Sequence, residues 1–319
     1  MTDRTGAIDV QHHILPPAYV DAVGAEAIGS LLVSGKVPVW TPQISVEAMD
    51  RNGIALAVTS ISAPAFPSET PQEARRLARL CNDYAARACA DHPGRFGMFA
   101  SLPMPDIAAS LRELEYALDE LGADGVCLMT SYDGRYPGHA DFRELFQELE
   151  HRGTVVHMHP VATPGPQYLP GIPAATLDFP FDTTRAVLSL LFEGVLSRLS
   201  RSRIILSHAG GALPFLADRI ARLERRPDFR AAVPEGARNL MQRLYVDTAL
   251  SANRSVFPSL LELFPPEQIL FASDYPFAPE DTMTATVTGL DALALPDDAL
   301  AAIRRENALR LMPTLAARM

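Results

Sequence analysis

The sequence is poor in cysteine and in basic charge, and it has no long apolar run. Its three cysteines are too few and too scattered for a disulfide framework or a thiolate metal site: Cys81, Cys89 and Cys127. Lys and Arg number 28 against 38 Asp and Glu, a net charge of −10, which gives no electrostatic reason to approach nucleic acid or an anionic membrane. No apolar run approaches the roughly 18 residues of a membrane span, and the first six residues show no charged-then-apolar leader. We therefore expect a cytoplasmic protein with no nucleic-acid or membrane partner.

Apolar segments alternate with amphipathic ones along the 319 residues. The apolar segments predict eight strands, at about 7–13, 54–61, 96–102, 125–129, 154–159, 203–207, 244–247 and 268–272. Helices are expected between them, at about 45–52, 71–91, 106–122, 141–152, from 181, 208–223 and 255–264, with two more from 281 and 297. An irregular insertion is expected at about 14–44 and a loop rich in Pro and Gly at about 160–180, a length typical of a segment that lines a site.

This alternation predicts a single (β/α)8 TIM barrel that spans residues 1–319. A doubly wound open sheet is the alternative. The barrel is favoured because no Gly-rich dinucleotide turn follows the first strand.

Chemically useful side chains stand at four predicted strand ends, where the active site of a barrel lies. They are Gln11 and His13 on the first strand, His159 on the fifth, His208 after the sixth and Asp274 after the eighth. Alternate residues of a strand share a face, so positions 11 and 13 can reach one site together. Each residue alone has an ordinary structural explanation, such as a helix cap for the aspartate, but their convergence predicts one shared site.

Two further histidines have structural interpretations. His157 lies two residues deeper than His159, where side chains fill the barrel interior, so we expect a buried, hydrogen-bonded residue. His12 alternates with its neighbours and should face the helices.

Motifs over nearly the whole chain resemble those of one family. Among them are His159-Pro160, Ser207-His-Ala-Gly-Gly211, Tyr245-Val-Asp-Thr-Ala-Leu-Ser-Ala252 and Phe271-Ala-Ser-Asp-Tyr-Pro-Phe277. The chain resembles the amidohydrolase-related decarboxylases, the group that contains aminocarboxymuconate-semialdehyde decarboxylase and, nearer to this sequence, 6-methylsalicylate decarboxylase.

The resemblance implies a divalent metal and a catalytic histidine. The ligand positions correspond to Gln11, His13, His159 and Asp274, and His208 matches the family's unligated histidine, which exchanges protons. Zinc is the expected ion, with manganese or magnesium as alternatives. Gln11 departs from the family's histidine, and a neutral amide oxygen is a weaker zinc ligand than imidazole.

The function implied by the resemblance is non-oxidative decarboxylation of a small aromatic, ortho-hydroxy acid of the salicylate type, with His208 and Asp274 in proton transfer. The alternatives are hydrolysis of a lactone, ester or amide on the same barrel, with or without metal, and a barrel that only binds a ligand. The resemblance also implies a homodimer or a higher homo-oligomer.

Overall fold

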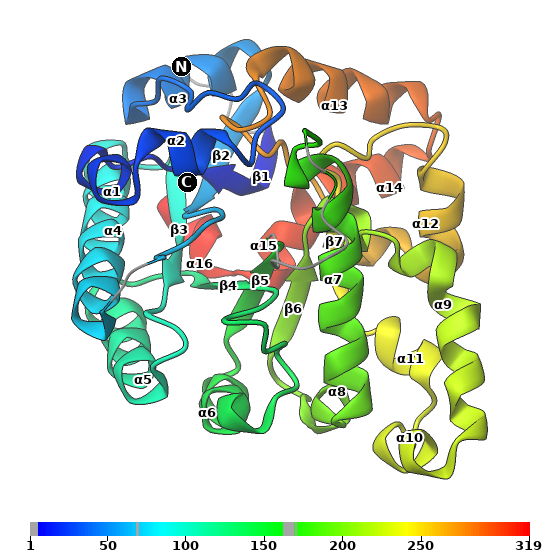
Figure 1. The fold of residues 1–319 in the computed structure, drawn as a ribbon. Helices are drawn as coiled ribbons and strands as arrows, with labels where there is room; N and C mark the ends of the chain where they lie inside the picture. Colours follow the sequence, from blue (N-terminus) through cyan, green and yellow to red (C-terminus); the bar gives the residue numbers. More distant parts are fainter. Residues whose placement is uncertain (1–5, 68–69, 162–168, 170) are drawn as a thin grey trace.

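Eight parallel strands form a barrel in chain order (Figure 1). The computed structural model describes residues 6–67, 70–161, 169 and 171–319. The strands are β1 Ala7–His13, β2 Ile54–Ser60, β3 Phe96–Ser101, β4 Gly125–Met129, β5 Val155–His159, β6 Arg203–Leu206, β7 Tyr245–Asp247 and β8 Ile269–Leu270. The first and last strands meet, since Val10 N donates to Phe271 O at 3.0 Å and Asp274 N to Gln11 O at 2.9 Å. The barrel prediction is confirmed, and the open-sheet alternative is wrong.

Helices connect consecutive strands and surround the barrel (Figure 1). They are α1 Pro17–Val23, α2 Ala25–Gly29, α3 Pro42–Arg51, α4 Pro71–Asp91, α5 Ile107–Glu115, α6 Arg143–Arg152, α7 Ala174–Phe192, α8 Val195–Arg198, α9 Leu213–Ala221, α10 Pro227–Ala232, α11 Ala237–Met241, α12 Phe257–Leu263, α13 Glu280–Ala292, α14 Asp297–Ala301, α15 Asn307–Leu311 and α16 Thr314–Arg318. In the part of the chain that the structure describes, no helix is long and apolar enough to cross a membrane.

Side-chain caps fix the starts of several helices. Asp106 Oδ1 accepts from Ala109 N at 3.0 Å and begins α5, and Thr70 caps α4 ahead of Pro71. Thr41 caps α3, which starts three residues before the expected helix at 45. The helix is capped at Thr41, so the expected start at Ser45 was too late.

Part of the expected loop at 160–180 is helical, although it contains Pro180. Helix α7 begins at Ala174 and continues through Pro180, seven residues before the expected start, so the loop is shorter than predicted. Buried Ala174 and Phe179 hold this first part of the helix against its neighbours. Residues 162–168 and 170 of the predicted loop lie outside the described residues. The insertion at 14–44 contains the short helices α1 and α2.

The barrel interior is filled by an apolar cluster that includes Ile8, Val10, Phe99 and Ile205. Helices α15 and α16 contribute to the same cluster and cover the end of the barrel where the strands begin (Figure 1). A bulge in β1 between Asp9 and His12 shifts its register with β2. Because a bulge changes which residues face inward, Ile8 and Val10 fill the interior below, while Gln11 and His13 reach the site above.

Candidate metal centre and active site

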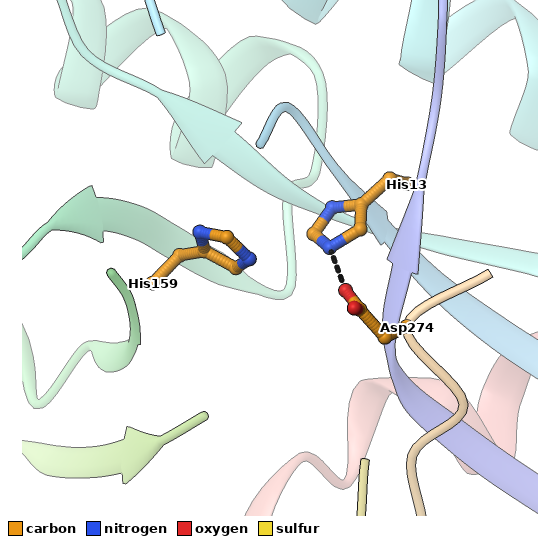
Figure 2. A group of neighbouring side chains, drawn as sticks. All are labelled: His13, His159 and Asp274. Carbon is orange, nitrogen blue, oxygen red and sulfur yellow. Dashed lines mark hydrogen bonds and ion pairs between the residues drawn. The ribbon is translucent and has the colours of Figure 1, made fainter. Parts of the chain in front are cut away.

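Three side chains from distant parts of the chain meet at the carboxyl end of the barrel (Figure 2). One ligand atom from each of His13, His159 and Asp274 lies within 4.8 Å of the others, and all three residues are buried. His13 Nε2 is 3.0 Å from Asp274 Oδ1, and the two imidazole rings meet edge-on with centroids 4.9 Å apart. These residues come from the ends of β1 and β5 and from the turn after β8, as the strand-end argument predicted.

Second contacts orient the two imidazoles. His159 Nδ1–H donates to Pro160 O at 2.8 Å, which leaves Nε2 with a lone pair toward the cluster. The Ser60 hydroxyl lies 3.2 Å from His13 Nδ1 and, because it can donate or accept, serves either tautomer. Burial, together with the charges of His13 and His208, lowers the pKa of His159 well below its usual value. Two imidazoles beside a carboxylate are a donor set that fits a divalent transition metal.

His208 stands next to this cluster, directly after β6. Its Nε2 lies 3.6 Å from Asp274 Oδ2. Burial opposes the ionisation of both groups, but the hydrogen bond and the charge of Asp274 raise the pKa of His208. Contacts with His13 and His208 likewise lower the pKa of Asp274 despite its burial. The pair can therefore hold a proton on His208 while Asp274 stays a carboxylate.

Both residues adopt a backbone conformation that side chains disfavour. His208 has φ +55° and Asp274 has φ +63°, in the left-handed region. Strain of this kind persists only where surrounding contacts hold it, and it is typical of functional sites.

A buried carboxylate holds each of these strained residues, and the sequence interpretation missed both carboxylates. Asp247, at the end of β7, accepts from the backbone N–H of His208 at 2.8 Å and of Ala249 at 3.1 Å. Its other oxygen is 3.5 Å from Nε2 of His157, whose ring stacks on Phe99. An acidic residue at a strand end was the available signal, the same one that identified Asp274.

Asp9 performs the corresponding role beside Asp274. Its Oδ1 accepts from Ser273 N at 3.0 Å and Gln11 N at 3.2 Å, and its Oδ2 accepts from His12 Nδ1 at 2.9 Å and from Ser273 Oγ. His12 also contacts Ser45 on α3, so it faces the helices as expected. The network joins the ends of β1 and β8 immediately before Asp274.

Gln11 also reaches the site. Its Nε2 donates to Asp274 Oδ1 at 2.7 Å and lies 3.1 Å from His208 Nε2. Gln11 and His13 thus both contact Asp274, as their shared face on the strand predicted.

A cavity of about 850 Å³ adjoins the cluster. Ile61, which lines it, precedes Ser62, whose hydroxyl is 3.4 Å from His159 Nε2. Met129, another lining residue, pairs with His159 across β4 and β5. The wall is largely apolar and includes Phe66, Leu102, Met104, Tyr132 and Val161. The space is ample for a small aromatic molecule beside the cluster.

Comparisons with known proteins agree with this geometry. The family model described as Amidohydrolase matches residues 8–314. The chain is 36% identical to a 6-methylsalicylic acid decarboxylase of Penicillium expansum over 318 residues, which cover 97% of this chain and 96% of that one. The crystal structure of an amidohydrolase II superposes with a TM-score of 0.89 at 29% identity, over 96% of this chain and 99% of the other. A dihydroxybenzoic acid decarboxylase from Polaromonas sp. JS666 with bound manganese shares the fold, with a TM-score of 0.78 at 23% identity over 97% of each chain.

Proposed function

Because this chain belongs to the amidohydrolase family, we propose that it is a metal-dependent, non-oxidative decarboxylase of a hydroxybenzoate-type acid, that is, a carboxy-lyase. The observation that carries the proposal is the convergence of His13, His159 and Asp274 on one point, with His208 beside them. Two of the three proteins named above are decarboxylases, which favours cleavage of a C–C bond over hydrolysis.

The donor set supports a divalent ion held by His13, His159 and Asp274. Two imidazoles and one carboxylate suit zinc, our first candidate, and also manganese, which the Polaromonas enzyme binds. When bound by these three residues, such an ion would act as a Lewis acid toward the acid that binds beside it. Elemental analysis of the purified protein distinguishes the two ions.

The chain's own residues address the difficult step of the reaction. Direct loss of CO₂ would leave an aryl anion with no way to delocalise its electrons, so a proton must reach the carboxyl-bearing carbon before or as the C–C bond breaks. We assign this proton to His208, whose pKa is raised by Asp274. The ring carbon gains the proton, the C–C electrons return to the ring, and CO₂ leaves. Asp274 stabilises the protonated imidazole and fixes its position.

The experiment is a CO₂-release assay with 6-methylsalicylate and 2,6-dihydroxybenzoate, run beside a panel of lactones, esters and amides. We expect release from at least one hydroxybenzoate and none of the hydrolytic products. His208→Asn and Asp274→Asn should each lower kcat by about 10²–10⁴-fold while the far-UV spectrum stays unchanged. His151→Asn, at an exposed position on α6, is the matched control. Near-normal turnover in both site variants, or activity only on the hydrolytic panel, would refute the proposal.

We also propose that the protein forms a homodimer or a higher homo-oligomer. Large apolar side chains are exposed where α7 meets the start of α9: Leu177 and Phe181 are 40% and 42% exposed, and Phe215 is 85% exposed. The two segments are adjacent because Ala212 N donates to Pro180 O at 3.3 Å. Exposed apolar patches of this kind are typical of protein interfaces. Sedimentation of the wild type and of Phe215→Asp tests the proposal, and a wild-type monomer at micromolar concentration would contradict it.

A further inference from the structure

The amide of Gln11 lies between the two residues that we assign to proton transfer. Its Nε2 is 2.7 Å from Asp274 Oδ1 and 3.1 Å from His208 Nε2, and the side chain is fully buried. We propose that Gln11 is a positioning residue that bridges Asp274 to His208, and that the divalent ion is held without it, by His13, His159 and Asp274. This inference rests on the metal dependence of the proposed function.

The hydrogen-bonding chemistry of an amide supports the bridge. An amide nitrogen carries two N–H donors and offers no lone pair to a metal. Here one donor faces the Asp274 carboxylate, and the other faces Nε2 of His208, which accepts it once the imidazole has given up its proton. Turning the amide over would place Oε1 against the carboxylate, so that two acceptors would face each other. Asp274 therefore fixes the orientation of the amide, through a charge-assisted hydrogen bond.

The backbone of Gln11 is bound as tightly as its side chain. Gln11 O accepts from Asp274 N at 2.9 Å, and Gln11 N donates to Asp9 Oδ1 at 3.2 Å. The residue is thus tied to Asp274 by two hydrogen bonds, one from the main chain and one from the side chain. A change of the Gln11 side chain therefore leaves the main-chain bond to Asp274 in place.

A ligand role for Gln11 would have to act through the other end of the amide. Gln11 Oε1 is buried and has no hydrogen-bond partner among the residues that the structure describes. A neutral amide oxygen is nevertheless a poorer ligand for zinc or manganese than the imidazoles of His13 and His159. Hydrogen bonds to ligating carboxylates are also a common means of orienting a metal site, and their loss typically lowers affinity or activity 10–100-fold.

Cobalt substitution tests the ligand set without any substrate. The apoprotein is titrated with Co²⁺, and its visible absorption reports the number and type of ligands. We expect Gln11→Leu to bind one Co²⁺ per chain with the wild-type band positions and intensity. His159→Leu, which removes an assigned ligand, is the positive control and should change the spectrum or abolish binding. A Gln11→Leu spectrum that changes as the control does would overturn the inference.

A double-mutant cycle tests the bridge to His208. Gln11→Leu alone should lower kcat by about 10–100-fold, whereas in a His208→Asn background the same change should cost less than about 3-fold, since one end of the bridge is already gone. If the fold-losses in kcat of the two single variants multiply in full in the double variant, the bridge from Gln11 to His208 is refuted. If the wild type binds no ion, the metal dependence fails and this inference fails with it. If the ion binds and only the Gln11 results disagree, the proposed function stands.

Discussion

Replacement of Asp9 by alanine should damage both stability and the site, because Asp9 joins the two ends of the barrel. The carboxylate accepts four hydrogen bonds, from the backbone of Gln11 and Ser273 and from the side chains of His12 and Ser273. Asp9 itself is fully buried. An alanine at position 9 leaves these four donors without an acceptor, and the site is too deeply buried for water to replace the carboxylate easily.

The magnitude follows from those contacts. A buried donor left unpaired costs about 1–3 kcal/mol, and four donors that relax in part give a loss on the order of 4 kcal/mol in the free energy of unfolding. The strained turn at Asp274, with φ +63°, also loses the contact that holds Ser273 beside β1. Because a displacement of about 1 Å in a site can lower turnover 10²-fold, we expect activity to fall by at least about that factor.

Urea unfolding followed by circular dichroism measures the first effect, and CO₂ release measures the second. Asp9→Asn keeps an acceptor for the two backbone donors and should lose only about half as much stability. Asp21→Ala, on the exposed side of α1, is the control for loss of one carboxylate. The proposed role of Asp9 is wrong if the free energy of unfolding of Asp9→Ala lies within about 1 kcal/mol of the wild-type value and the variant retains its turnover.

Three further outcomes are expected. Chelation should lower both activity and Tm, and added Zn²⁺ or Mn²⁺ should restore them; a Tm that is indifferent to chelator would argue against a resident ion. Burial would raise the pKa of Glu150, but hydrogen bonds from Ser200, Ser202 and Arg201 lower it from 4.5 to about 2. Glu150 thus contributes on the order of 2 kcal/mol to the free energy of unfolding above pH 4.5, and this contribution is lost as the pH falls towards 2. Glu150→Gln should flatten that part of the curve of stability against pH. An unchanged curve would contradict the assignment. Gly211→Ala places a Cβ 2.0 Å from Pro180 O at φ +65°, so it should cost about 2–4 kcal/mol in urea unfolding and lower turnover; a loss under about 0.5 kcal/mol would show that the turn after His208 adapts freely.

Local signals in the sequence determined much of the fold. Caps such as Asp106 and Thr70 act within one helical turn, so they can be identified from residues next to them. Alternation of apolar strands with amphipathic helices likewise depends on neighbours and predicted the barrel. Given the barrel, the carboxyl ends of the strands must meet at one rim, and this is why the sequence alone groups His13, His159, His208 and Asp274.

Only the tertiary structure decided how those residues are held. Contacts between residues far apart in the chain determine the bulge in β1 and the start of α7 at Ala174. They also determine the hydrogen bonds that Asp9 and Asp247 accept from neighbouring strand ends. Asp247 carries only the general signal of an acidic residue at a strand end, and nothing in the sequence near Asp9 or Asp247 identifies their partners, because these come from other parts of the chain. The same holds for Gln11: the sequence shows an amide at a ligand position, whereas its contacts with Asp274 and His208 exist only because β1, β6 and β8 converge.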